Sequence, residues 1–406
     1  MATLVATPAT RSDAAKGDAM PARWGAVYAM ALCSFVLVAS EFLPVSLLSP
    51  IAKTLRLTEG QAGQAIAISG VFAVVTSLSL SVLLGRIDRR RVVLALIAML
   101  IVSGIMVALA PSYLVFMTGR ALLGVAIGGF WSMSAAIAIR LVPEESVGKA
   151  LAIMSGGTAL ATALAAPIGS FLGSLIGWRG AFFCVVPVAV GALAWQAIAL
   201  PKLPVAERQS ARATIGLLRS RAVLLGLFAV AMLFVGQFAL FTYLRPFLEQ
   251  VTHVSVVMLS VMLLIVGASG FVGTVVIGRF VVERLFVTLW VLPGAMAMVA
   301  VGLALFGGST IATAVLLAVW GFTGTAAPVG WWTWLAQTLP DDAEAGGGLM
   351  VAVVQLAITL GATVGGVVYD TAGAVPEFLS SAALLGVAAI AAVAVARHDR
   401  TTAAHQ

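Results

Sequence analysis

Charged side chains are scarce in this sequence: they make up 10% of its 406 residues, whereas a soluble globular protein carries about 25%. Hydrophobic residues account for 61%, and the mean hydropathy is +1.10. A single water-soluble core could not bury so many apolar side chains, so lipid must surround most of the surface. The apolar runs are continuous rather than alternating, which favours helices over the strands of a membrane barrel. The sequence therefore predicts an all-α membrane protein.

Cysteine and histidine are also scarce. Cys33 and Cys184 both lie in apolar segments, which predicts small core residues without a disulfide or a metal site. His253, His398 and His405 lie outside the apolar segments, and no acidic pair lies inside them. We therefore expect neither an enzyme active site nor a resident cofactor. The chain also lacks a phosphate-cradling G-x-x-x-x-G-K-[ST] loop, which excludes a pump driven by ATP.

Twelve apolar segments are long enough to cross a bilayer, since a membrane helix needs about 20 apolar residues. We predict spans at 25–50, 61–84, 92–110, 113–139, 147–173, 180–200, 222–248, 256–280, 286–306, 309–338, 345–370 and 376–396. The connections are short except for a basic stretch that we predict to link two six-helix halves. The predicted organisation is a tail at 1–23, a first half at 24–200, a linker at 201–221, a second half at 222–396 and a tail at 397–406.

The net charge of +7 comes mainly from Lys and Arg residues between the predicted spans. Of the 23 such residues, 18 fall on the side of the two termini and 4 on the opposite side, and the last is Arg120. Because basic loops stay in the cytoplasm, this bias predicts that both termini are cytoplasmic. We expect the chain to lie in the cell inner membrane. This origin of the basic charge gives no reason to expect a nucleic-acid partner.

The two predicted halves are weakly similar to each other. A shift of 197 positions places Gly124 on Gly321, Pro143 on Pro340 and Gly169 on Gly366. These matches cluster in and after spans 4 and 10 and in spans 5 and 11, which favours an internal duplication over chance. In one large class of secondary transporters, two such repeats hold the substrate between them near the middle of the membrane.

One acidic and one basic residue lie well inside the predicted spans. Arg120 lies in the fourth span, although a charge at the bilayer centre costs about 2.5–3.5 kcal/mol or more. Glu41 lies in the first span, and at 1.5 Å per residue both side chains lie about 10–14 Å below the outer surface. We expect an ion pair in which Glu41 takes up and releases a proton while Arg120 supports its charged form. A purely structural clamp is the alternative.

Several aromatic and amide side chains lie on helical faces that could look into a central cavity. The candidate substrate-binding residues are Trp131, Gln237, Phe241, Tyr243, Trp331 and Gln355. Aromatic rings stack on flat ligands, and amides donate and accept hydrogen bonds along a polar edge, so the set suits a small molecule such as a nucleobase. Lipid-facing positions are the alternative for each aromatic residue taken alone.

The connection between spans 2 and 3 reads G-R-I-D-R-R-R-V-V-L from Gly85 to Leu94. An acidic residue among arginines at a helix end could lock a cytoplasmic gate, so Asp88 and Arg89 are candidate gating residues. The alternative is that these arginines only orient the chain in the membrane.

These segments resemble the twelve-span drug/proton antiporter branch of the major facilitator superfamily. The loop from Asp88 to Arg91 is similar to the motif of that superfamily between spans 2 and 3. Arg120 with Gly124 matches its motif in span 4, whose arginine the family is thought to use in proton coupling.

Longer stretches are similar to bacterial purine ribonucleoside efflux pumps, namely EFLPVSLL at 41–48, GGFWSMSA at 128–135, GQFALFTYLRP at 236–246 and PVGWWTW at 328–334. The resemblance implies the major facilitator fold and a monomeric carrier that works by alternating access. It also implies export of inosine- or guanosine-like nucleosides in exchange for protons. An exporter of sugars or amphiphilic drugs from the same branch is the alternative.

Overall fold

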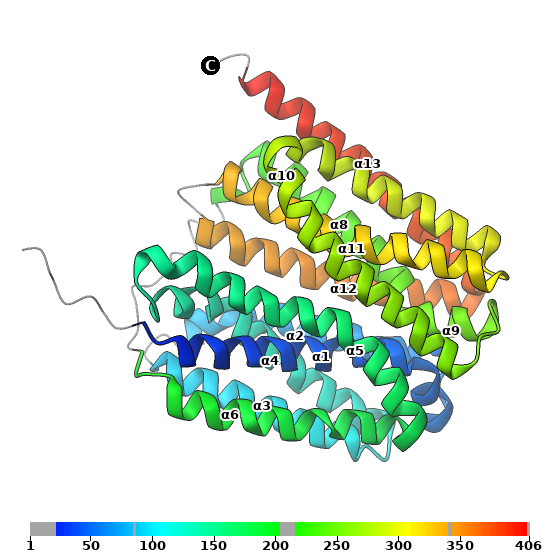
Figure 1. Ribbon diagram of the computed structural model, residues 1–406, viewed down its shortest axis with the longest axis horizontal. Coiled ribbons are helices and arrows are strands. Elements are labelled where there is room, and N and C mark those ends of the chain that lie inside the picture. Colours follow the sequence, from blue (N-terminus) through cyan, green and yellow to red (C-terminus); the bar gives the residue numbers. More distant parts are fainter. Residues whose placement is uncertain (1–21, 84–86, 204–215, 340–342, 404–406) are drawn as a thin grey trace, which may run out of the picture.

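The computed structural model describes residues 22–83, 87–203, 216–339 and 343–403, which are almost entirely helical (Figure 1). The helices are α1 (Trp24–Leu55), α2 (Glu59–Leu83), α3 (Arg89–Ala108), α4 (Tyr113–Ile139), α5 (Val147–Phe183), α6 (Val185–Ala199), α8 (Arg221–Thr242), α9 (Leu244–Gln250), α10 (Val256–Phe306), α11 (Thr310–Thr338), α12 (Ala343–Ala372) and α13 (Ala374–Ala403). Most of the predicted N-terminal tail and of the predicted linker, and the last residues of the C-terminal tail, lie outside the described residues.

All twelve predicted crossings are present. Within the described residues, 11 segments are long and apolar enough to span a membrane, and one of them, Val147–Ala199, contains two crossings. The chain turns there at Gly177, where φ is 74° and ψ is 164°, a conformation that glycine adopts readily because it lacks a Cβ atom. Helix α10 also holds two crossings, and these separate at Arg284, which has the non-helical angles φ −135° and ψ 42°.

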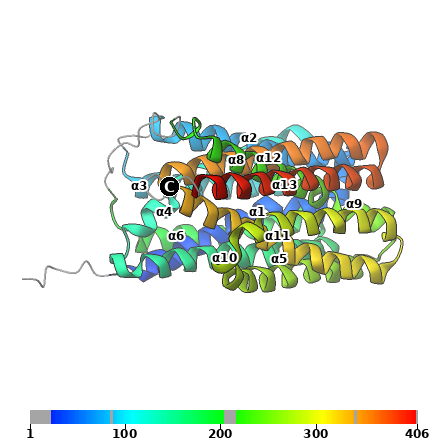
Figure 2. The ribbon, with the colours of Figure 1, turned by 90° about the horizontal axis from the view of Figure 1, so that it is seen from above.

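The crossings form two bundles that lie side by side, α1–α6 in one half and α8–α13 in the other (Figures 1 and 2). The first and last described residues lie toward the same end of the molecule, which we call the linker end. The opposite end, which we call the distal end, contains the turns around Arg56, Leu109, His253 and Gly373. The two halves contact each other through α2 against α12, α5 against α10, and α9 against α1.

The halves repeat each other in their contacts as well as in their sequence. A Cβ atom at Gly124 of α4 would overlap the carbonyl of Ser69 in α2. A Cβ atom at Gly321 of α11 would overlap the carbonyl of Val266 in α10. Each residue of the second pair follows its counterpart by 197 positions, so the repeat predicted from the sequence is present as the same close helix contact in both halves.

A second pair of contacts obeys the same shift. Gly128 of α4 packs directly on the backbone of Ala73 in α2. At the equivalent positions of the second half, the hydroxyl of Thr325 donates to the carbonyl of Gly270 at 2.6 Å. The larger threonine therefore replaces a bare glycine contact with a hydrogen bond, while the helices keep the same register.

Candidate functional site

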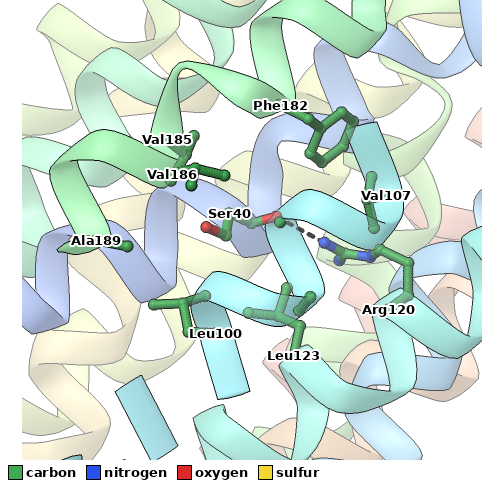
Figure 3. Close-up of a pocket in the computed structure, with 11 residues that line it drawn as sticks. Ser40, Leu100, Val107, Arg120, Leu123, Phe182, Val185, Val186 and Ala189 are labelled. Atoms are coloured by element: carbon green, nitrogen blue, oxygen red, sulfur yellow. Dashed lines mark hydrogen bonds between the residues drawn. The ribbon is translucent and has the colours of Figure 1, made fainter. Parts of the chain in front are cut away.

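Arg120 is the most completely buried cation of the predicted site, with 1% of its surface exposed. Its Nε donates to the carbonyl of Ala65 at 2.9 Å, and its Nη1 donates to the carbonyl of Ser40 at 2.7 Å (Figure 3). Its Nη2 donates to the carbonyl of Glu41 at 3.1 Å and to the hydroxyl of Ser69 at 3.3 Å. These acceptors offset the cost of burying the charge, and they tie α1 and α2 to α4.

The carbonyl of Ser40 is available because of a proline one helical turn later. Pro44 lies inside α1 and has no backbone N–H, so the carbonyl four residues earlier loses its helical donor. That carbonyl belongs to Ser40, and the guanidinium of Arg120 supplies the missing donor. The proline and the arginine therefore form a matched pair, although they lie on different helices.

Glu41 is also buried, with 4% of its surface exposed, but among the described residues its carboxylate forms no ion pair with the guanidinium. The Glu41 Oε1 accepts a hydrogen bond from Nε2 of Gln355 in α12, at 3.4 Å. The predicted ion pair is therefore not formed between these two described side chains, because the guanidinium is occupied by backbone carbonyls of the same stretch of α1.

The contact between Glu41 and Gln355 joins the two halves of the molecule. One long hydrogen bond is weak support for a buried carboxylate, and the Oε1 atom of Gln355 has no partner among the described residues. The carboxylate therefore lies at the boundary between the two halves, where its one described hydrogen bond is long.

Phe42, the next residue along α1, was not predicted as a site residue. Its ring stacks on Phe238 of the second half, with centroids 5.6 Å apart, and meets the edge of Phe241 at 6.3 Å. The predicted residue Phe241 is therefore part of an aromatic contact across the boundary. The sequence signal was the position of Phe42 directly after the buried carboxylate.

Gln237 shows the same use of a freed carbonyl as Arg120. Pro328 inside α11 leaves the carbonyl of Gly324 without a helical donor, and the Nε2 of Gln237 donates to that carbonyl at 3.2 Å. The other amide atom, Oε1 of Gln237, has no partner among the described residues. The half-buried side chain is thus held at one end and can accept a hydrogen bond at the other.

Trp131 of α4 is half-buried and packs on a small apolar cluster made by Val38, Ala39, Ala161 and Ala165. Phe35 and Phe42 pack on the same cluster. Half-exposed rings of α1 and α4 thus surround one apolar patch, which a flat solute could contact.

The charged couple has no counterpart in the second half. The shift of 197 positions places Phe238 opposite Glu41 and Leu317 opposite Arg120. Leu317 is fully buried, and Phe238 belongs to the aromatic contact with Phe42. The first half therefore carries two charged residues at these positions, and the second half carries an aromatic and an aliphatic residue.

Comparison with known proteins agrees with this arrangement. Residues 30–361 match the sequence model of the Major Facilitator Superfamily. The chain belongs to the major facilitator superfamily. Members of this superfamily are transporters rather than enzymes, so the protein is a multi-pass membrane transporter.

Two curated superfamily relatives cover nearly the whole chain. The "Transcription regulatory protein OpdE" of Pseudomonas aeruginosa is 54% identical over 378 residues, which cover 92% of this chain and 94% of that relative. The "Purine ribonucleoside efflux pump NepI" of Salmonella paratyphi B is 38% identical over 383 residues, covering 94% of this chain and 96% of that pump. A solved bacterial homologue of the human lysosomal transporter Spinster, at 15% identity, superposes with a TM-score of 0.77 over 93% of this chain and 97% of the other, which shows the shared fold.

Two of the predicted substrate-binding residues lie in packed interiors of this transporter. Tyr243 is 0% exposed, donates to the carbonyl of Ala362 at 2.7 Å and stacks on Tyr369. Trp331 is 1% exposed and meets the edge of Trp334 at 5.5 Å. In this conformation both rings are buried. The hydroxyl of Tyr243 also packs directly on Gly63 of α2, so this ring lies at the boundary between the two halves.

Asp88 caps the N-terminus of α3 and ties it to the chain after α6. Its Oδ1 accepts from the backbone N–H of Arg90 at 2.8 Å and of Leu203 at 3.0 Å, and the N–H of Arg89 donates to the carbonyl of Leu203 at 3.0 Å. Burial alone would raise the pKa of Asp88, but these hydrogen bonds and the charges of Arg91 and Arg90 hold that pKa below its ordinary value. These contacts join α3 to the start of the predicted linker, and a gate between the halves stays a prediction.

A small cavity lies beside Arg120, among α1, α3, α4, α6 and the end of α5 (Figure 3). Its lining is apolar apart from Ser40, Ser103 and Arg120. Because the cavity lies within the first half, away from the boundary that Glu41 and Gln355 share, we do not assign it to the transported solute. Among the described residues, no group of three His, Cys, Asp or Glu side chains could hold a metal ion.

Proposed function

We propose that the protein exports purine ribonucleosides or similar solutes in exchange for protons, by alternating access between the two halves. The observation that carries the proposal is the carboxylate of Glu41, which is buried at the boundary of the halves with one weak hydrogen bond from Gln355. Glu41 takes up a proton when the boundary opens to the distal side and releases it when the boundary opens to the linker side.

The basic loops at the linker end support a cytoplasmic position for both termini, in the cell inner membrane of a bacterium. A proton that enters down a potential of 100 mV releases about 2.3 kcal/mol. Since about 1.4 kcal/mol corresponds to a tenfold ratio, one proton per solute sustains a gradient of roughly fifty-fold. We propose a monomeric carrier that needs no cofactor.

The proposed solute contacts come from both halves. Phe42, Phe241 and Trp131 offer rings on which a flat base can stack, and Gln237 and Gln355 each offer an amide oxygen that has no partner in the part of the chain that the structure describes. Amide groups that read the edge of a base and rings that hold its faces suit a nucleoside better than a sugar. The Salmonella relative, a purine ribonucleoside efflux pump by name, supports the same class of solute.

The Pseudomonas relative is named as a regulator of transcription. We propose that any effect of this chain on transcription comes only from the internal concentration of a solute that it transports. A protein that bound the solute without transporting it would contradict this view. The vesicle experiment below measures transport directly.

Everted membrane vesicles test the proposal. We expect inosine to cause proton movement in vesicles that carry the wild-type protein, and we expect Glu41→Gln to abolish it without loss of folded protein. The matched control is Glu377→Gln, which removes another buried carboxylate but leaves the boundary intact. Undiminished proton-driven transport by Glu41→Gln would refute the role of Glu41. Competition by a panel of sugars and amphiphilic drugs, stronger than that by inosine, would instead favour the alternative solutes.

A further inference from the structure

We infer that two side chains of the second half, Arg245 and Asp370, hold the distal end closed by binding backbone groups of the first half. We call each of these contacts a latch. The inference rests on the proposed alternating access, which requires the distal end to open and close. It adds the identity of the residues that set the balance between the two states.

The first latch joins α9 to α1. Arg245 is 4% exposed, and its Nη1 donates to the carbonyl of Ser46. That carbonyl lacks a helical donor because Pro50, four residues later in α1, has no N–H. The Nε atom of Arg245 is held by Oε1 of Glu249 at 2.8 Å, which fixes the direction of the guanidinium. The latch thus pairs a cation with a backbone acceptor that the fold leaves free.

The second latch joins α12 to the beginning of α2. The Oδ1 atom of Asp370 accepts from the N–H of Gly60 at 2.9 Å, and its Oδ2 accepts from the hydroxyl of Thr58 at 2.6 Å. The first N–H groups of a helix have no helical acceptor and carry a partial positive charge, so a carboxylate is a favourable partner. A Cβ atom at Gly60 would overlap this carboxylate and the carbonyl of Gly366, so glycine permits the close approach.

The two latches are complementary in charge. A cation of the second half binds a free carbonyl of α1, and an anion of the second half binds the free N–H of Gly60 in α2 together with the hydroxyl of Thr58. Each latch uses a backbone group that has no partner inside its own helix, so opening must expose that group to water. Glu377, in the first turn of α13, is also buried near the distal end, but no described hydrogen bond joins its carboxylate to the first half.

The ratio of molecules with a closed distal end to those with an open one can be measured by double electron–electron resonance, between spin labels at the distal ends of α1 and α12. Lys53→Cys and Thr371→Cys provide exposed label sites in the two halves, in a Cys184→Ser background because Cys184 is exposed while Cys33 is buried. The protein is studied in lipid nanodiscs without any solute or proton gradient. A negative result with nucleosides therefore has no bearing on this measurement.

Two variants each weaken one latch. Asp370→Asn keeps the shape of the side chain but removes its charge, and Pro50→Ala restores the N–H that competes with Arg245 for the carbonyl of Ser46. We expect each variant to lower the ratio of closed to open molecules about tenfold, which corresponds to about 1.4 kcal/mol. We expect the double variant to lower it further.

The controls match each change. Glu377→Gln removes a carboxylate near the same end, and Pro293→Ala removes a helix proline of α10 in the second half, away from the latches. Both should leave the distances unchanged. The inference is overturned if Asp370→Asn and Pro50→Ala also leave them unchanged, or if the controls shift them by as much. Because alanine continues a helix where proline interrupts it, Pro50→Ala is expected to fold even if the charge variant does not.

Discussion

The pairing of Arg120 with the carbonyl that Pro44 sets free makes a quantitative prediction about stability. Replacing Arg120 by leucine, the residue at the equivalent position of the second half, removes the donor from the carbonyl of Ser40. The carbonyls of Ala65 and Glu41 keep their helical donors, but that of Ser40 keeps none. An unsatisfied buried polar group costs about 1–3 kcal/mol, whereas hydrogen-bond couplings measured inside membrane proteins average about 0.6 kcal/mol.

The double-mutant cycle of Arg120→Leu with Pro44→Ala isolates the free energy that Arg120 contributes by donating to the carbonyl of Ser40. In the Pro44→Ala background the alanine N–H can donate to Ser40, so the arginine becomes less necessary there. We expect Arg120→Leu to cost about 1 kcal/mol less in that background than in the wild type. Unfolding in mixed detergent micelles, followed by the fluorescence of the nine tryptophans, measures the four free energies of unfolding.

A second cycle serves as the control. Arg120 and Pro328 lie in different halves, so Arg120→Leu and Pro328→Ala should add within about 0.5 kcal/mol. The cycle of Gln237→Leu with Pro328→Ala should show a coupling of the same sign as the first cycle, because Pro328 frees the carbonyl that Gln237 binds. Additivity of Arg120→Leu with Pro44→Ala would refute the assignment of the Ser40 carbonyl as the partner that Arg120 must satisfy.

Hydropathy and charge bias predicted the helical crossings and the two halves because these depend on the composition of long segments. The shift of 197 positions also carried structural information, since Gly124 and Gly321 make equivalent contacts with α2 and α10. The importance of Arg120 followed from the cost of burying it, which is independent of its partner. Properties that depend on the average composition of a segment, or on the chemistry of one residue, could thus be predicted from the sequence.

The partners of the site residues were not accessible in the same way. Opposite charges at similar depth predicted an ion pair. Instead, the carboxylate of Glu41 accepts a hydrogen bond from Gln355, and the guanidinium of Arg120 donates to backbone carbonyls of α1. Tyr243 and Trp331 are both buried in this conformation, Tyr243 against Gly63 of the first half, so their role as ligand contacts stays a prediction. One signal could have been used: a proline in a predicted span identifies the carbonyl four residues earlier as a site for a distant donor.

The asymmetry of the duplicated halves explains why the proposed coupling residues lie in the first half alone. Phe238 and Leu317 stand where Glu41 and Arg120 stand in the first half, so the second half has no buried charge at this depth. A single protonatable carboxylate between the halves can change the affinity of one half for the other when it gains or loses its charge. Two such couples related by symmetry would oppose each other across the same boundary.

Two further predictions test the linker end and the repeat. The pKa of Asp88 is lowered in the folded protein, so its contribution to stability is present above the unfolded pKa of about 3.9 and is lost as the pH falls through the folded value. The unfolding midpoint of the wild type should therefore fall more steeply below about pH 4 than that of Asp88→Asn, which keeps a helix cap without the charge; parallel pH profiles would contradict this. Gly124→Ala and Gly321→Ala should each lower the free energy of unfolding by about 1–3 kcal/mol, because the new Cβ atoms overlap the carbonyls of Ser69 and Val266. The control is Gly148→Ala, where a Cβ atom meets nothing within 4 Å and alanine should stabilise α5 by up to about 1 kcal/mol. If one of the paired glycines tolerated alanine as well as Gly148 does while the other did not, the helix contacts of the two halves would not be equivalent, and the duplication would extend to the sequence but not to the packing.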